Sequence, residues 1–419
     1  MKLAHLVCAV LAAAALDAAA AERPAQIVDL DTVMRLVREG PRLGLERQGI
    51  AQAEADRITA GTYPNPTLSY GLARPSGGQR TNFDATVQHQ ATLQLPLLVN
   101  GQRGARVERA EREIEAARAR VAAGASTQAA EAGAAFVGLL AAQEKAALLT
   151  QAIEEVARLQ QVISGRQESG VASRYDVARF DVELGGLRAR LIDAQAEVSD
   201  RSGMLAALLA LPGWQPVASG TLAPLPLEPG KVAAQDARLY TPAVAAALKE
   251  EAAAQSGIDV ARRERWPVPS VGVGQTWTND PYGASTFVGL TMEIPLFDTR
   301  RGPLARARAD AHAATLRRQL VTAETAAHLQ RLTNVIAVRR EALDRFEQDA
   351  ASKLPPLRQM AEDAYRLGRG SILELLDATR SRYDLLQARR DLAAGLLEAQ
   401  VRLLALRGAL ENPMPAAAR

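Results

Sequence analysis

The sequence changes its pattern most sharply at residues 83–95, which read FDATVQHQATLQL. One row, from Phe83 through His89 to Leu95, is apolar apart from the histidine, and the side chains between its members are all polar or acidic. Strict alternation of this kind is typical of a β-strand with one apolar and one polar face. Residues 67–73 alternate in the same way, and the segment between them contains Pro75-Ser76-Gly77-Gly78, which favours a turn. A β-hairpin is therefore predicted at about residues 66–97.

Long helices are predicted directly after this hairpin. No proline occurs between Pro96 and Pro212, and residues 103–164 are rich in Ala, Leu, Arg, Glu and Gln. These residue types are strong helix formers. A continuous helix of this length would extend roughly 90–95 Å. The pattern breaks near the glycines and serines of 164–173 and resumes to about residue 211, which predicts a helical hairpin over about 103–211.

The second half of the chain repeats this plan. Four short motifs recur in the same order about 200 positions later: Pro64-Asn65-Pro66 as Pro267-Val268-Pro269, Leu95-Pro96-Leu97 as Ile294-Pro295-Leu296, Gln102-Arg103-Gly104 as Arg300-Arg301-Gly302, and Gly170-Val171-Ala172-Ser173 as Gly368-Arg369-Gly370-Ser371. One coincidence would mean little, but four in order indicate a duplication. The first repeat is placed at 22–211, a linker at 212–237 and the second repeat at 238–411.

The second repeat is expected to contain the same elements. A hairpin is predicted at about 268–296, with its turn near residues 279–283, and a helical hairpin at about 303–410 that is interrupted at Pro355-Pro356. Shorter helices are expected before the two hairpins, at about 29–61 and 238–265. Residues 412–419 are expected to form a flexible tail.

The first 21 residues have the order of a secretory signal peptide. A lysine lies near the start, Leu6–Leu16 is apolar, and Ala19-Ala20-Ala21 precedes Glu22. About 11 apolar residues are too few to cross a bilayer as a helix. Whether a lipid anchor is also attached is left open. The chain is therefore expected to be exported.

Composition excludes several classes of function. The chain has one cysteine and four scattered histidines, so no disulfide framework or metal-ligand cluster is expected. No Ser/His/Asp set or phosphate loop is present, and the arginines lack the stacking aromatic residues of nucleic-acid binding. We therefore expect no catalytic residues, no cofactor, no bound metal and no nucleic-acid partner.

Four alternating strands cannot close a membrane barrel by themselves. Open strand edges are not tolerated in lipid, and small membrane barrels have at least about eight strands. Three chains would supply about 12 strands, with the polar face lining a water-filled lumen. The long helices would then continue this lumen as a tube.

The mature chain resembles the TolC family of outer membrane factors, the exit ducts of tripartite efflux and type I secretion systems. The resemblance rests on the duplicated plan, the Gly-x-x-Ser turns and Leu375-Leu376-Asp377-Ala378-Thr379 with Tyr383. Gln102-Arg103-Gly104-Ala105-Arg106 and Val171-Ala172-Ser173-Arg174-Tyr175-Asp176 look most like the heavy-metal branch of the cobalt-zinc-cadmium type. The fold implied is mainly α with a small β-barrel portion: a 12-stranded barrel and an α-helical tunnel in a trimer.

The resemblance also implies partners and sites. It implies a homotrimer in outer membrane lipid, whose tunnel crosses the periplasm to a periplasmic adaptor and an inner-membrane pump of the resistance-nodulation-division type. The adaptor would dock on two tip turns, formed by Gly170, Val171, Ala172 and Ser173 and by Gly368, Arg369, Gly370 and Ser371. Glu374, Asp377 and Tyr365 would form the pore gate. The family's gate arginine is replaced by Gly370, so only Arg366 or Arg369 is expected to substitute for it.

Alternative functions stay open at this point. The duct could serve drug or small-molecule efflux or protein secretion instead of metal efflux, because cargo specificity resides mostly in the pump. A periplasmic adaptor would show one helical hairpin beside a soluble domain. A secreted coiled-coil protein would lack the alternating strands.

Overall fold

The computed structural model describes residues 23–74, 87–170, 172–226, 241–278, 283–351, 354–367 and 369–411. The predicted signal peptide, the turns of both hairpins, Val171, Gly368 and the tail lie wholly or mostly outside these residues. The chain forms two compact units. Unit 1 comprises residues 1–46, 121–242 and 323–419, and unit 2 comprises 47–120 and 243–322.

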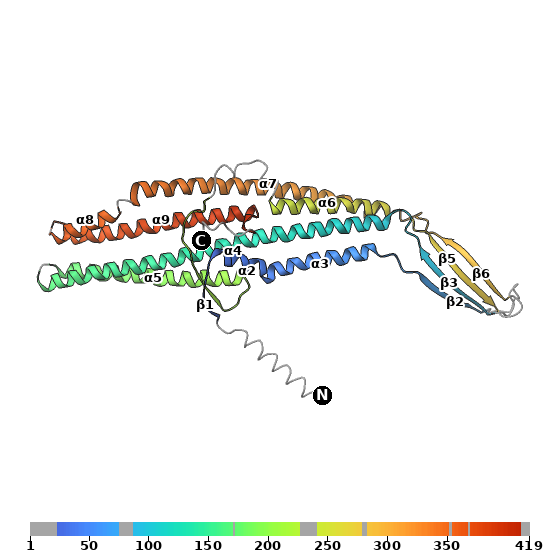
Figure 1. Cartoon of the computed structure of the whole chain (residues 1–419), viewed down its shortest axis with the longest axis horizontal. Coiled ribbons are helices and arrows are strands. Elements are labelled where there is room, and N and C mark those ends of the chain that lie inside the picture. The colour runs from blue at the N-terminus through green and yellow to red at the C-terminus, as the bar shows by residue number, and fades with distance from the viewer. Residues whose placement is uncertain are drawn as a thin grey trace, which may run out of the picture. The chain divides into compact units, whose positions relative to one another are not determined.

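Unit 2 contains a four-stranded antiparallel sheet (Figure 1). Its strands are β2 (Thr67–Ala73), β3 (Gln88–Pro96), β5 (Ser270–Thr278) and β6 (Ala284–Thr291), in the order β2-β3-β5-β6. Each half of the sequence therefore contributes one hairpin, as predicted. The two hairpins are joined through β3 and β5, and β2 and β6 form the edges of the sheet.

The pairing register keeps the apolar side chains of all four strands on one face. Leu93 of β3 lies opposite Leu68 of β2 and Val273 of β5, and Val273 lies opposite Val288 of β6. This face is exposed in the single chain: Val288 is 74% exposed and Leu68 72% exposed. An apolar sheet face of this extent that is open to its surroundings is typical of a wall in contact with lipid.

The opposite face is polar and carries one aromatic side chain. Gln94 lies opposite Thr67 and Gly272, and Thr92 lies opposite Gly274. A Cβ atom at Gly274 would overlap with the Phe287 ring, so the absence of a side chain at this glycine makes room for the ring. Glycine in a strand often marks such a close approach.

Helices of unit 2 are joined by ion pairs. The helices involved are α3 (Pro41–Gly61), α6 (Pro242–Arg263), the first part of α4 (Gln102–Glu168) and the first part of α7 (Arg301–Phe346). Arg57 lies 2.9 Å from Glu111, and Lys249 lies 2.9 Å from Glu115. Glu251 is the most enclosed acid of these pairs, and it receives hydrogen bonds from Thr315 and Arg318.

Unit 1 contains the two helical hairpins. The first is the remainder of α4 with α5 (Arg174–Leu208), and the second is the remainder of α7 and α8 (Leu354–Arg366) with α9 (Ile372–Leu406). α4 and α5 pack together through Leu149, Val156, Phe180 and Leu184, and α8 and α9 also lie side by side (Figure 1). Cross-hairpin ion pairs join α4 to α9: Arg382 lies 2.8 Å from Glu155, and Arg390 lies 3.0 Å from Glu144.

The interruption expected at Pro355-Pro356 lies earlier in the chain. A five-residue π-helical turn, Glu347–Ala351, follows α7, and α8 begins at Leu354 with both prolines in its first turn. The first residues of a helix donate no hydrogen bond within it, so proline is tolerated there. The α-helical pattern therefore breaks before the prolines and not at them.

Two further differences between the predicted and the observed elements concern the start of the first repeat and the segment between the repeats. The helix expected over 29–61 is divided at Gly40 into α2 (Leu30–Glu39) and α3. The segment expected to be a linker contains β4 (Trp214–Ala218), which pairs in parallel with β1 (Arg23–Val28). β1, α2 and β4 cover a core that includes Val33, Leu139, Leu205, Trp214 and Val401. The chain between the repeats is thus part of a packed layer.

One described helix is long and apolar enough to cross a bilayer. This is α4, but half of its apolar stretch is buried inside the protein. A core helix satisfies the same criterion, so this feature alone does not indicate a membrane span.

Candidate functional site

The turn between α4 and α5 is closed by backbone hydrogen bonds and a helix cap. Gly170 has a φ of +78°, and its N–H donates to the Gln167 carbonyl over 2.9 Å. A left-handed glycine after the end of a helix is the common way to terminate it. Ser173 then caps α5, and Asp176 completes a capping box with it.

The turn between α8 and α9 ends in the same cap. The Ser371 hydroxyl accepts from the Glu374 N–H at 3.2 Å, and the Glu374 carboxylate accepts from the Ser371 N–H at 3.1 Å. The two cap residues have nearly identical backbone angles, φ −85° and ψ 157° at Ser173 and φ −84° and ψ 157° at Ser371. Such capping boxes satisfy amide groups that would otherwise lack a partner at a helix start. The duplication therefore extends to individual hydrogen bonds.

The two turns differ in how closely their glycines are packed. Around Gly170 an added Cβ would meet nothing within 4 Å, so its constraint is the backbone angle. At Gly370 an added Cβ would come 3.1 Å from the Ala364 side chain and 3.2 Å from Glu374. Gly370 thus allows the chain to pass close to the end of α8. Ala172 and Arg369 flank the turns, while Val171 and Gly368 lie outside the described residues.

The two acids predicted for the gate have different environments. Glu374 is exposed, but its carboxylate is held by the cap of α9. Asp377, one turn further along, is exposed and forms no hydrogen bond or ion pair with any residue that the structure describes. Its charge is therefore available to the surroundings.

Tyr365 is contacted by an arginine of the first repeat. The Arg166 guanidinium lies over the Tyr365 ring, 4.8 Å from its centre, and donates to the Tyr365 carbonyl over 3.4 Å. Arg366 instead lies near Asp363, at 3.8 Å. The arginine on the Tyr365 ring thus comes from the other hairpin, and the substitution of Arg366 or Arg369 for the family's gate arginine stays a prediction.

A groove of about 490 Å³ runs between the hairpins beside this contact. It is lined by Glu155, Arg158, Leu159, Val162, Arg166, Glu362, Tyr365, Arg366 and Leu375. Glu155, at its inner part, is buried and bound to Arg382. The groove brings charges of both signs to the end of the hairpins that carries the turns.

Two side chains of the helical hairpins have pKa values that are shifted from their usual range. A hydrogen bond to Glu197 raises the pKa of Lys145, and the pair lies 2.9 Å apart between α4 and α5. Burial raises the pKa of the Tyr383 hydroxyl. Both shifts keep these groups in one protonation state at neutral pH, which is typical of structural groups and not of acid–base catalysts.

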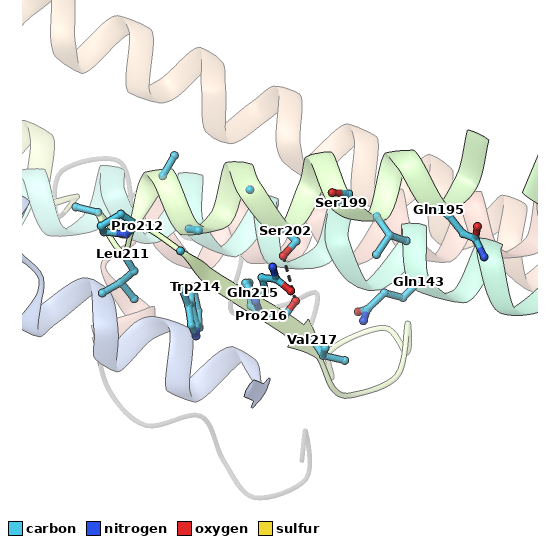
Figure 2. A pocket seen from close by; sticks show the side chains of 16 residues that line it. Gln143, Gln195, Ser199, Ser202, Leu211, Pro212, Trp214, Gln215, Pro216 and Val217 are labelled. Atoms are coloured by element: carbon cyan, nitrogen blue, oxygen red, sulfur yellow. Dashed lines mark hydrogen bonds between the residues drawn. The ribbon is translucent and has the colours of Figure 1, made fainter. Parts of the chain in front are cut away.

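A larger hollow of about 850 Å³ lies between α5 and β4. Figure 2 shows amide and hydroxyl side chains around it, including Gln143, Gln195, Ser199 and Ser202. The Gln143 side chain accepts from the Ala218 N–H at 3.0 Å, so it fixes the end of β4. Among the described residues, no three His, Cys, Asp or Glu side chains converge as a metal site.

Comparison with known proteins identifies the family to which this architecture belongs. The family model of outer membrane efflux proteins matches residues 45–211 and 233–410, which are most of both repeats. The chain belongs to the outer membrane efflux protein family. It is accordingly an outer membrane channel protein that extends into the periplasm, which confirms the predicted family and location.

Individual relatives agree with this assignment. The cobalt-zinc-cadmium resistance protein CzcC of Cupriavidus metallidurans is 26% identical over 337 residues, covering 80% of this chain and 78% of CzcC. The nickel-cobalt-cadmium resistance protein NccC of Alcaligenes xylosoxydans is 30% identical, covering 67% of this chain and 63% of NccC. The solved structure of CusC, described as forming a transmembrane channel, has a TM-score of 0.71 at 17% identity and covers 90% of this chain and 91% of CusC. The predicted fold class is thereby confirmed, and the family and fold are those of channel-forming proteins.

Arg166 is the residue of this region that sequence reasoning missed. It lies in the segment 164–173 where the helical pattern breaks, but nothing local relates it to Tyr365. The Ser-x-x-acid spacing at Ser173 and Ser371 was present in the sequence as a signal for both caps.

Proposed function

We propose that this outer membrane efflux protein is the exit duct of a heavy-metal efflux system, which works as a homotrimer with a periplasmic adaptor and an inner-membrane pump. The observation that carries the metal assignment is the similarity to CzcC and NccC, two metal-resistance proteins, over most of this chain. Among the residues that the structure describes, no three His, Cys, Asp or Glu side chains converge as a metal site. The duct supplies a passage, and the pump supplies the energy and the selection.

The sheet supports the trimer. One chain contributes four strands with β2 and β6 as open edges, and its apolar face is exposed. Open edges in lipid must be paired. Pairing β2 of one chain with β6 of the next would remove every edge and place the polar face inward. Purified protein in detergent should therefore have the mass of a trimer by light scattering, and a monomer would contradict this part of the proposal.

The two capped turns support docking of the adaptor. They present the same Ser-centred cap twice, and both lie at the ends of long hairpins. Gly170 is exposed with open space around it, so a partner backbone can approach. Gly170→Val would force a β-branched residue to φ +78° and should abolish export, while Gly170→Asn, which tolerates this angle, should retain much of it. Equal export by both variants would place the adaptor elsewhere.

The cargo is tested in cells. Deletion of the gene should sensitise the host to cobalt, zinc, cadmium or nickel, and the wild-type gene should restore resistance. A panel of organic drugs and a secreted-protein assay in the same strains test the alternatives. Sensitivity to drugs alone, or loss of protein secretion alone, would replace the metal assignment and leave the duct architecture unaffected.

A further inference from the structure

Five exposed arginines gather where the strands of the sheet join the helices. They are Arg103, Arg263, Arg265, Arg300 and Arg301, and we name them the arginine collar. Arg103 follows the end of β3, Arg263 and Arg265 precede β5, and Arg300 and Arg301 follow β6. Pro96 of β3 pairs with Ser270 of β5, which pairs with Thr291 of β6, so all three positions belong to the same end of the sheet.

Four of the five collar arginines donate hydrogen bonds to backbone carbonyls. Arg103 donates to the Gly61 carbonyl over 2.6 Å, and Arg300 donates to the Glu264 carbonyl over 2.9 Å. Arg263 and Arg265 make longer bonds of 3.3 Å to the carbonyls of Asn100 and Thr299. Within the part of the chain that the structure describes, no collar arginine forms an ion pair with an acid.

This pattern of bonding leaves the charge of the collar uncompensated. A carbonyl bond uses one of the five N–H donors of a guanidinium and cancels none of its charge. Neighbouring arginines behave differently: Arg106 is paired with Glu264 at 2.9 Å and Arg262 with Asp259 at 3.2 Å. Four of the collar arginines are therefore positioned cations whose remaining donors are available to an anionic partner, and Arg301 adds a fifth exposed charge.

Exposed aromatic side chains accompany the collar. Phe297 is 99% exposed, Tyr63 64% and Trp266 63%. The Arg103 guanidinium lies over the Tyr63 ring, 4.9 Å from its centre. Aromatic rings exposed beside arginines are typical of a membrane–water interface, where the ring enters the lipid and the cation meets the headgroups.

The other end of the sheet carries a second aromatic group on the apolar face. His89 stacks on Trp277 at 5.5 Å, and its Nδ1 lies 2.7 Å from the Tyr70 hydroxyl. A strand of nine residues, such as β3, extends about 30 Å, which is close to the thickness of a bilayer core. The apolar face therefore lies between two aromatic groups, and the collar borders one of them.

We propose that the arginine collar binds the phosphate headgroups of anionic phospholipid in the periplasmic leaflet of the outer membrane. The leaflet follows from the family, since the helices next to the collar extend into the periplasm. Arginine is suited to phosphate because its planar fork donates two parallel hydrogen bonds. The collar would fix the depth of the sheet in the bilayer. This inference does not depend on the cargo of the duct.

Lipid selectivity of the full-length protein tests the proposal. The protein is placed in phosphatidylcholine nanodiscs, and the association of spin-labelled phosphatidylglycerol is compared with that of spin-labelled phosphatidylcholine by electron spin resonance. Wild type should prefer phosphatidylglycerol by at least about fivefold, given the attraction of one arginine to an anionic surface. The preference should fall at high salt, because exposed charges are screened.

A matched pair of triple variants separates the collar from general charge. Arg263→Gln, Arg265→Gln and Arg301→Gln together should remove most of the preference. The control, Arg308→Gln, Arg317→Gln and Arg331→Gln, removes the same charge from exposed arginines of α7 and should retain it. A preference that survives in the collar variant, or that falls equally in the control, would overturn the proposal. Loss of the phosphatidylglycerol preference when excess inorganic phosphate is added at constant ionic strength would also overturn the proposal. The collar would then be a site for free phosphate and not for lipid.

A second measurement needs no change to the collar. The chain has three tryptophans, so Trp214→Phe with Trp277→Phe leaves Trp266 as the single fluorophore. Lipids brominated near the headgroup should quench Trp266 more strongly than lipids brominated near the chain end. No quenching by either lipid would place Trp266 away from the bilayer and overturn the proposal.

Discussion

The Arg166 guanidinium lies 4.8 Å from the centre of the Tyr365 ring, although the two residues are 199 positions apart. This contact joins the tips of the two helical hairpins of one chain. It lies beside the groove between them, and Tyr365 is the residue that sequence similarity marked for the gate. We therefore expect the contact to help hold the tip closed.

Arg166→Gln should make the tip open more readily. A cation over an aromatic ring contributes about 0.5–2 kcal/mol, depending on exposure. The expected result is a higher open probability of the purified channel in planar bilayers, with a similar change in Tyr365→Leu and little further change in the double variant. Arg158→Gln is the control, because Arg158 lines the same groove but is not on the ring. An effect of Arg158→Gln as large as that of Arg166→Gln would assign the result to groove charge.

The acids at the start of α9 should control cation selectivity. In a trimer Glu374 and Asp377 would each occur three times around the axis, and such acidic rings favour cations. Glu374→Gln with Asp377→Asn should shift the reversal potential toward zero and weaken block by multivalent cations. Glutamine at this position can still form the capping box, so α9 should keep its start.

Ser371→Ala is the matching control for those acids. It removes the cap, at a cost of about 1 kcal/mol, and leaves both charges in place. Selectivity should therefore persist in Ser371→Ala and disappear in the acid variants, more clearly at low salt. If the acid variants conduct like wild type, the two side chains are ordinary exposed groups of a helix.

The register of β3 predicts different costs for neighbouring arginine substitutions. Leu93 lies on the apolar face and is 50% exposed, whereas Gln94 lies on the polar face. Leu93→Arg at a lipid-facing midplane position should cost about 2–4 kcal/mol, and Gln94→Arg should cost much less. Urea unfolding in lipid vesicles measures both. Equal losses would mean that this sheet is not a membrane wall.

Acid should weaken the pairing of α6 with α7 through Glu251. The hydrogen bond from Thr315, together with Arg318, lowers the pKa of the Glu251 carboxyl below its usual value. A lowered pKa stabilises the folded state above the unfolded value of about 4.3, and this contribution is lost as the pH falls through the folded value. Glu251→Gln should lower the melting temperature at pH 7 and flatten its decline below about pH 4.

The adjacent Glu250 provides a control for that measurement. Glu250→Gln removes a carboxylate that lies 3.4 Å from Arg120, and Glu250 receives no hydrogen bond from Thr315. Its melting temperature should follow the wild-type pH dependence closely. Parallel curves for wild type and Glu251→Gln would show that this carboxylate does not contribute to the acid sensitivity.

Local patterns in the sequence were sufficient for the four-stranded sheet and the long helices of this fold, but not for β1 and β4. Alternation over residues 67–73 and 88–95 requires strands because side chains of a strand point to opposite faces in turn. The long proline-free stretches require helices because each keeps its backbone bonds within itself. The turns followed too, since Gly170 can adopt a left-handed angle and Ser371 can cap the next helix.

Contacts between distant segments were decided only by the tertiary structure. Nothing near Arg166 specifies Tyr365, and nothing near Trp214 specifies that β4 pairs with β1. These pairs form because burying apolar surface between helices and strands, as at Val33 and Leu139, brings together residues that share no local pattern. The sequence alone therefore determined the long helices, the four strands of the sheet and the capped turns, because those depend on neighbours along the chain, whereas it did not show β1, β4 or the division between α2 and α3. Packing determined which arginine meets Tyr365 and which strands share an edge, because those depend on neighbours in space.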